Sequence, residues 1–328
     1  LIPRAGHCAG LVMSKIAHPP PHHYQPIVNS AYSYSWIVNF IIGADNDHIV
    51  SGMSPWPTVF GAPRTGITHM ESVMSIAPVW FISHGAPDLV LRDQPATHFL
   101  KNLRLGDLKG LVVISAHWFT RSELQINVEP NPALMYDFYG FPEPLYHIRW
   151  PASSPLWLQE AVSDQLLLAG LPAEPVRREL DHGVWSPLSL MDPASTVPLV
   201  QLSIPASFTP RQLWQLGEAL QQLRAQGIGI LASGAITHNL RALGPENSPV
   251  PGWARSFVNW LELTMSEGDR VALEDYRARA PGAVESHPHD DHLRPLFVAL
   301  GAAGQDKPVK LHDSWDGGSL YMGSYRFG

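Results

Sequence analysis

The chain has 328 residues, 45% of them hydrophobic and only 16% charged, so it can bury a sizeable core without a disulfide. A formal charge of -7 and the lack of any lysine and arginine cluster argue against nucleic acid or an anionic membrane as a partner. The single cysteine, Cys8, excludes cysteine-based zinc sites and iron–sulfur clusters, so any metal must be held by His, Asp or Glu.

No segment predicts a membrane span or a secretory signal. The longest apolar run near the N-terminus, residues 36–42, is far too short to cross a bilayer, and no basic-then-apolar signal pattern is found. We therefore expect a cytoplasmic protein, either a monomer or a small homo-oligomer. The charge balance favours a small, weakly charged or neutral substrate over a macromolecular partner.

Residues 1–73 differ in character from the rest of the chain. They contain proline-rich stretches such as His18-Pro19-Pro20-Pro21-His22-His23, and they show no sustained helical or strand periodicity. Met70 and Met74 stand just before the first strong strand, and translation from either would leave the preceding residues as upstream or fragmentary sequence. We expect an irregular segment over residues 1–73, with its histidines solvated, and one domain over residues 74–328.

From residue 75 onward, short β-branched runs alternate with amphipathic helices, which is typical of an α/β protein. The expected strands are residues 78–83, 111–115, 197–204 and 228–233. We predict a single α/β domain in which a central, mostly parallel sheet is flanked by helices.

Three helices and a closing hairpin complete the expected elements. Thr209-Pro210 is typical of a helix start, and the helix that follows returns the chain to the sheet. Its apolar face repeats at three- and four-residue steps, at Leu213, Leu216, Leu220 and Leu223. Further helices are expected at residues 253–265 and 291–301. The turn signal Asp316-Gly317-Gly318 predicts a hairpin within residues 308–327.

Histidines follow three of the predicted strands near the point where each strand ends. His84 directly follows the first strand, His117 follows the second, and His238 lies four residues beyond Gly234. In open α/β sheets the carboxyl ends of the strands form the ligand crevice, so these side chains converge. A lone histidine of this kind is more often a core residue bonded to a carbonyl, but three in the same placement favour a metal site at the carboxyl ends of the strands.

Two further histidines join this group. His182 lies in a predicted loop, where Asp181 either orients it or is an exposed loop residue, and His292 opens the helix expected at 291–301. His287 and His289 flank a proline in a loop, so we expect them to be surface residues or groups behind the ligands.

These histidines stand in short motifs that run in order through residues 75–328. The motifs are Ser83-His84-Gly85-Ala86-Pro87, Ser115-Ala116-His117-Trp118, Asp137-Phe138-Tyr139-Gly140-Phe141-Pro142, Asp181-His182-Gly183-Val184-Trp185, Ala232-Ser233-Gly234, Thr237-His238-Asn239-Leu240 and His292-Leu293-Arg294-Pro295-Leu296. By these motifs the sequence resembles the class III extradiol dioxygenases, and within them the branch of 4,5-DOPA extradiol dioxygenases. Several motifs in the right order are far more specific than any one of them.

The resemblance implies an enzyme that opens catechol-type rings such as that of DOPA with O2, with residues 74–328 as its catalytic domain. It implies that His84 and His117 are metal ligands and that His292 stands where related ring-cleaving enzymes have a glutamate. His238 matches the family's catalytic histidine, which also reaches the metal, and His182 matches a histidine lining the substrate side.

One Fe(II) or Zn(II) per chain is therefore expected, because an all-imidazole set suits zinc at least as well as iron. His238 either binds the metal only when substrate is absent or stands just outside the ligands. Tyr136, Asp137 and Phe138 are expected to contact the substrate, since flat apolar walls suit an aromatic ring; the alternative is a surface loop whose aromatic residues merely pack.

Two other functions stay open from the sequence. A zinc-dependent hydrolase would use the same metal to activate water, with His238 or His182 as the base. A metal-binding relative without catalysis would share the fold, but such proteins are not expected to keep the complete histidine set.

Overall fold

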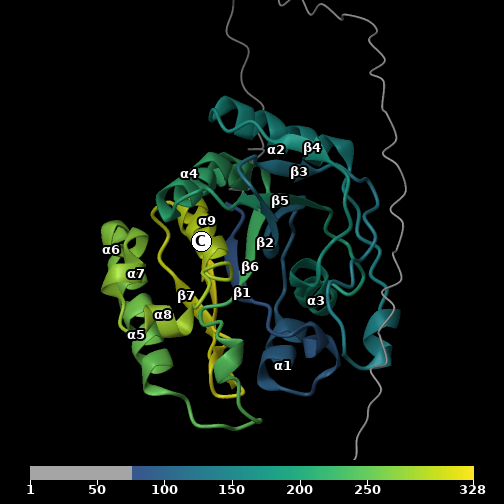
Figure 1. The fold of residues 1–328 in the computed structure, drawn as a ribbon. Helices are drawn as coiled ribbons and strands as arrows, with labels where there is room; N and C mark the ends of the chain where they lie inside the picture. Colours follow the sequence, from purple (N-terminus) through teal and green to yellow (C-terminus); the bar gives the residue numbers. More distant parts are fainter. Residues whose placement is uncertain (1–75) are drawn as a thin grey trace, which may run out of the picture. The chain divides into compact units, whose positions relative to one another are not determined.

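The computed structural model describes residues 76–328, so the segment expected to be irregular, residues 1–73, lies outside the described residues. Most of the strands within the described range belong to one large sheet. They are β1 (Val79–Ser83), β2 (Gly110–Thr120), β3 (Gln125–Asn127), β4 (Glu174–Val176), β5 (Leu199–Pro205), β6 (Ile228–Gly234), β7 (Val309–His312) and β10 (Ser324–Phe327). Their order across the sheet is β4-β3-β5-β2-β6-β1-β10-β7 (Figure 1).

The centre of the sheet is parallel. Strands β1 and β2 both pair in parallel with β6, and β2 also pairs in parallel with β5. Antiparallel pairs occur toward the two sides, where β10 joins β1 and β7, and β3 joins β5. The predicted fold class, a single α/β domain with a mostly parallel sheet flanked by helices, is confirmed.

Both faces of the sheet are covered by helices, which are α1 (Pro95–Asn102), α2 (Leu156–Leu168), α3 (His182–Met191), α4 (Pro210–Leu220), α5 (Gly252–Glu267), α6 (Arg270–Glu274), α7 (Tyr276–Arg279), α8 (Ala283–Ser286) and α9 (Arg294–Ala303). Helices α1 and α3 lie on one side of the central strands, and α4, α5 and α9 lie on the other (Figure 1). No helix in the described part of the chain is long and apolar enough to cross a membrane.

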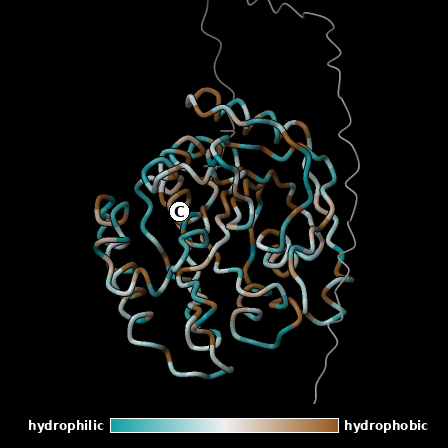
Figure 2. Tube along the Cα trace, viewed as in Figure 1, coloured by the Kyte–Doolittle hydropathy of each residue, from teal (hydrophilic) through white to brown (hydrophobic). Residues whose placement is uncertain are grey.

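The alternation of side chains along the strands builds a separate core on each face. In β1, Val79 and Phe81 pack into the core that holds α4, α5 and α9, whereas Trp80 and Ile82 pack into the core that holds α1 and α3. Because both faces are buried, these strands are continuously apolar, as the hydropathy along the central strands shows (Figure 2).

The chain ends in a nested hairpin, as the turn signal predicts. Strand β7 pairs with β10 at one edge of the large sheet, and β8 (Trp315–Asp316) pairs with β9 (Leu320–Tyr321) inside the connection. The inner hairpin carries Asp316 and Leu320 toward the carboxyl end of β1, where both line the cavity described below.

Two predicted boundaries were wrong near histidines. Helix α9 begins at Arg294 rather than at residue 291, so His292 lies in the turn before the helix. Pro295 explains this, because proline fits best in the first turn of a helix, where its missing N–H is not needed. His182 was expected in a loop but is the first residue of α3.

Helices α4 and α9 cross in backbone contact. A Cβ atom added to Gly217 of α4 would lie 2.1 Å from the Val298 carbonyl oxygen, and one added to Gly301 of α9 would lie 2.0 Å from the Trp214 carbonyl oxygen. Helix α9 also packs on β6 and directly follows His292. The close crossing therefore helps to determine where His292 lies.

We predict that Gly301→Ala lowers the free energy of unfolding by about 1–3 kcal/mol, because the added methyl group overpacks the crossing. Alanine is intrinsically better than glycine within a helix by about 1 kcal/mol, so the loss would be a packing effect. Urea denaturation measures it. Gly252→Ala in α5 is the matched control, since nothing lies within 4 Å of its added Cβ. Equal stability of the Gly301 variant and the parent protein would contradict the tight crossing.

Candidate metal centre

Three neighbouring strands bring their carboxyl ends together at the centre of the sheet. His84 directly follows β1, and His238 follows β6 by four residues. His117 lies within β2, where the pairing with β5 shifts register between Ile114 and Phe119. Because β2, β6 and β1 are adjacent, histidines far apart in sequence reach one region.

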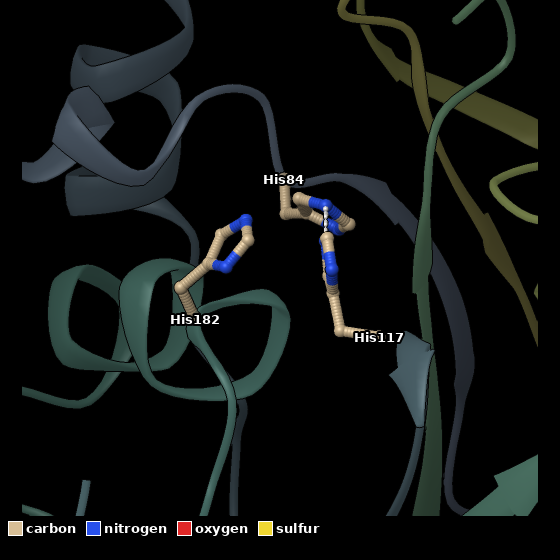
Figure 3. A group of neighbouring side chains, drawn as sticks. All are labelled: His84, His117 and His182. Atoms are coloured by element: carbon tan, nitrogen blue, oxygen red, sulfur yellow. Dashed lines mark hydrogen bonds between the residues drawn. The ribbon is translucent and has the colours of Figure 1, made fainter. Parts of the chain in front are cut away.

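His182 and His292 complete the cluster from outside the sheet. His182 extends from the start of α3 toward the rings of His84 and His117, which point toward each other (Figure 3). The ring centroids of His117 and His182 are 4.0 Å apart, and those of His117 and His292 are 4.9 Å apart. The structure thus brings together all five histidines that the sequence singled out.

The Nε2 atoms of three rings converge at spacings that suit a shared ion. Nε2 of His117 lies 3.0 Å from Nε2 of His84 and 3.3 Å from Nε2 of His292. Two nitrogens that are each about 2.0–2.1 Å from one metal ion lie about 3–3.4 Å apart at bond angles of roughly 90–109°. The donor set therefore fits a divalent ion bound by imidazole.

Burial keeps these rings neutral, which a metal ligand requires. Desolvation by burial, and then repulsion from the other histidines, hold the pKa of His84 well below its usual range. Burial, with His182 as a further cause, lowers the pKa of His117 to about 3 although Asp137 acts in the opposite direction. The pKa of His292 is lowered for the same reasons. Lone pairs on neutral imidazole are therefore available near neutral pH.

Ser233, at the end of β6, selects the tautomer of His84. The Ser233 hydroxyl donates its single proton to the carbonyl of Gly183, so at His84 Nδ1, 2.9 Å away, it must act as an acceptor. The proton of His84 is then on Nδ1, and the Nε2 lone pair faces the other histidines. Gly183 is needed here because a Cβ atom at that position would lie 2.4 Å from Ser115 Oγ.

Asp137 contacts two of the histidines, His182 and His117, and does not line the cavity described below. Its Oδ1 accepts from His182 Nδ1 at 2.9 Å and from the His182 backbone N–H at 3.1 Å, and its Oδ2 lies 3.7 Å from His117 Nδ1. The expectation that Asp181 either orients His182 or is exposed was wrong on both counts. Asp181 is fully buried and accepts from Ser115 Oγ and Gln201 Nε2.

His238 stands beside the converging nitrogens. Its ring stacks on that of His292 with the centroids 3.5 Å apart and the planes 12° from parallel. Ligand atoms of His238, Asp291 and His292 lie within 4.8 Å of one another. Burial lowers the pKa of His238, and the Asp291 carboxylate opposes that shift. Whether His238 binds the metal stays a prediction.

A cavity of about 600 Å³ opens above the histidines. Its floor is formed by all five rings, and its apolar walls include Phe141, Leu320 and Met322. The three residues expected to contact substrate, Tyr136, Asp137 and Phe138, are not part of this lining. Phe138 packs edge-on behind His182, with the ring centroids 5.8 Å apart. The aromatic segment therefore reaches the cavity through Phe141 instead.

The cavity lining also carries a cluster of charged side chains, which the sequence did not reveal. Arg92 donates to both carboxylate oxygens of Asp316 at 2.6 and 2.8 Å, and Asp88 and Glu246 lie in the same lining. Arg149 donates to the Tyr136 hydroxyl and lies outside this lining. Asp316 had been interpreted only as a turn residue, so no local signal linked it to Arg92.

Comparison with known proteins identifies the family. Residues 93–328 match the family described as the catalytic LigB subunit of aromatic ring-opening dioxygenase, a match over more than half of the chain. The chain belongs to this family. Members depend on a metal ion, and the described structure offers a group of three histidines, His84, His117 and His182, that could hold one. The family match begins at residue 93, so the case for His84 rests on the geometry of the site.

Relatives of this ring-opening dioxygenase match most of the chain. It is 37% identical over 268 residues to "4,5-DOPA dioxygenase extradiol" of Beta vulgaris, covering 79% of this chain and 99% of that protein. It is 35% identical over 262 residues to the protein of the same name in Escherichia coli (strain K12), covering 76% of this chain and 94% of the relative. The crystal structure of an uncharacterized protein from Escherichia coli K12 has a TM-score of 0.65 at 31% identity, covering 77% of this chain and 100% of that one.

The protein is thus an extradiol ring-cleavage dioxygenase, as the motifs predicted. The family implies an aromatic substrate and O2 as reactants. Membership decides against the two alternatives left open by the sequence, a zinc-dependent hydrolase and a metal-binding relative without catalysis.

We predict that Ser233→Ala weakens metal affinity by about 10–100-fold, the usual effect of removing a group that orients a ligand. Without the hydroxyl, His84 loses the acceptor that keeps its proton on Nδ1. Titration against a competing chelator measures the affinity. Ser203→Ala is the matched control, since Ser203 is also fully buried at the end of a strand but its hydroxyl accepts from the Gln125 N–H. An unchanged affinity in the Ser233 variant would show that the tautomer is set in another way.

Proposed function

We propose that the enzyme opens the ring of a catechol such as DOPA, with one Fe(II) or Zn(II) held by His84, His117 and His292. The observation that carries this proposal is the convergence of the three Nε2 atoms at 3.0 and 3.3 Å in a buried cluster of neutral rings. In the reaction, the ring bond between one hydroxyl-bearing carbon and its neighbour without a hydroxyl breaks. Both atoms of O2 enter the product.

The three-histidine donor set indicates a divalent metal ion but does not choose between iron and zinc. Three neutral imidazoles without a carboxylate suit Zn(II) as well as Fe(II), so both are kept in the proposal. When bound, a divalent ion supplies Lewis acidity and a common site for the catechol oxygens and O2.

His238 is proposed to be the acid and base of the reaction. It lines the cavity and stacks on His292, so it adjoins the site where the catechol hydroxyls would bind. Imidazole can take the proton of the second hydroxyl and return it during cleavage. The stacked geometry supports a position beside the ligands, and His238 is kept as a fourth ligand only as the alternative that the experiment below tests.

His182 is proposed to form a hydrogen bond with a hydroxyl group of the substrate. Because Asp137 accepts a hydrogen bond from Nδ1–H of His182, the tautomer of His182 with this proton on Nδ1 has its free lone pair on Nε2. His182 also lines the cavity floor. In this state it would accept a hydrogen bond from a substrate hydroxyl, and Asp137 would keep the ring in that orientation.

The shape and charge of the cavity support a catechol with a charged side chain. The apolar walls suit an aromatic ring over the histidines. In the same lining, Asp88, Arg92, Glu246 and Asp316 offer both signs of charge. DOPA carries an ammonium and a carboxylate on a short side chain, and relatives that match this chain bear the name 4,5-DOPA dioxygenase extradiol.

The function is tested by reconstitution without oxygen. Metal-free enzyme is loaded with Fe(II) or, in parallel, with Zn(II), mixed with DOPA and then exposed to air. We expect one O2 consumed per ring opened and a yellow product, and no reaction in His84→Ala, which should hold little metal. A metal-replete enzyme that consumes no O2 with DOPA, protocatechuate, gallate or simple catechol would overturn the proposal.

A single variant separates the two roles of His238. If it is chiefly an acid and base, His238→Ala should bind metal and catechol nearly as the parent does but turn over about 10²–10⁴-fold more slowly. If it is an obligatory ligand, metal affinity should fall by about 10–100-fold or more. Metal analysis and single-turnover kinetics decide between them. His292→Ala, expected to be metal-poor, and His289→Ala, an exposed site, are the two controls.

A further inference from the structure

The loop that carries His238 is hydrogen-bonded to the end of α8 and to the residue after it, His287. The backbone N–H of His238 donates to the carbonyl of Ser286 at 2.8 Å, and Asn239 Nδ2 donates to the carbonyl of Glu285 at 2.7 Å. On the other side of His238, Nε2 of His287 lies 2.8 Å from the carbonyl oxygen of Ile236. Residues 236–239 and 285–287 therefore run side by side, with a hydrogen bond before, at and after His238.

His287 contributes the one side-chain bond of this set that comes from the helical side. It is fully buried, so of the two expectations, a surface residue or a group behind the ligands, the first is wrong for His287, whereas His289 is exposed. Its backbone N–H donates to the carbonyl of Ala283 at 3.0 Å, and its carbonyl accepts from Arg277. Its ring packs edge-on against Phe257, with the centroids 5.6 Å apart. These contacts with α5, α7 and α8 leave the ring little freedom.

The chemistry of the contact specifies the tautomer of His287. A carbonyl oxygen can only accept, so the proton of the neutral ring must be on Nε2. Burial lowers the pKa of His287 to about 4, which keeps the ring neutral near pH 7. The bond is therefore a single, directed N–H to O=C interaction.

The opposite side of the same loop is also anchored. Thr237 Oγ1 donates to the carbonyl of Ser319 at 2.8 Å and accepts from the backbone N–H of Tyr321 at 2.7 Å. The two residues that precede His238 are thus held from two directions: Ile236 by His287, and Thr237 by the inner hairpin. Strand β6 alone does not determine where His238 lies, because His238 is four residues beyond the strand.

We propose that His287 is a positioning residue that holds the backbone of His238, and through it the imidazole, in place over His292 and the cavity. This inference rests on the proposed catalytic role of His238. Loss of the donor leaves the Ile236 carbonyl buried without its partner and allows the loop to shift. A displacement of about 1 Å in a reacting group can cost about 10²-fold in rate.

The test compares two substitutions in the full-length, metal-loaded enzyme. His287→Leu removes the donor at similar volume, and His287→Gln keeps an N–H that can reach the carbonyl. We expect kcat for DOPA to fall about 10–100-fold in the leucine variant, with metal content and KM near those of the parent, and to return to within about threefold in the glutamine variant. His289→Leu, two residues away and exposed, should leave kcat unchanged.

A double variant shows whether the effect passes through His238. In the His238→Ala background, His287→Leu should cost no further activity, because the residue that it positions is already absent. Parental kcat in His287→Leu, loss of metal from it, or full additivity with His238→Ala would each overturn the proposal. If the leucine variant does not fold, the glutamine variant decides: a tenfold loss of kcat in His287→Gln with metal retained would also overturn the proposal. Parental activity in His238→Ala would instead refute the proposed acid and base role.

Discussion

The site depends on one constraint, the convergence of imidazole nitrogens whose lone pairs face one another in a buried place. His117 Nε2 lies 3.0 and 3.3 Å from its two counterparts, too close for rings that all carry charge. Neutral imidazole nitrogens at these spacings suit a divalent cation bound between them. The parallel strands β1, β6 and β2, the bulge in β2 and the turn before α9 all serve to bring these atoms together.

Polar groups behind the rings decide which nitrogen faces inward. The Ser233 hydroxyl accepts a hydrogen bond from Nδ1–H of His84. Asp137 accepts one from Nδ1–H of His182 and also lies near His117. These groups are themselves held in place. The Ser233 hydroxyl donates to Gly183, and the nearby Ser115 hydroxyl accepts the His117 backbone N–H and donates to buried Asp181. The metal centre is thus the inner part of a larger hydrogen-bonded unit that joins β2, β6 and α3, and these bonds orient the ligands.

The cavity proposed to bind the substrate is built largely from other parts of the fold. Much of the cavity lining comes from the segment after β1 and from the inner hairpin near the C-terminus, which are joined by the Arg92–Asp316 pair. That pair links residues 224 positions apart. Variation in these segments could therefore change substrate preference without disturbing the histidines, because loops at the carboxyl edge of a sheet tolerate change better than the strands beneath them.

The sequence by itself determined the fold class, the central strands and the five histidines of the site. Continuous apolar runs identify strands buried on both faces, and a polar side chain at the end of such a run is conspicuous. Only the tertiary structure showed that Asp137 accepts from His182, that Asp181 is buried, that His287 bonds to the carbonyl of Ile236, and that Arg92 pairs with Asp316 in the cavity lining. Each of these depends on directed hydrogen bonds or an ion pair between residues far apart in the chain. Periodicity reports only which face of an element is buried, and it carries no information about which distant partner a polar group will meet.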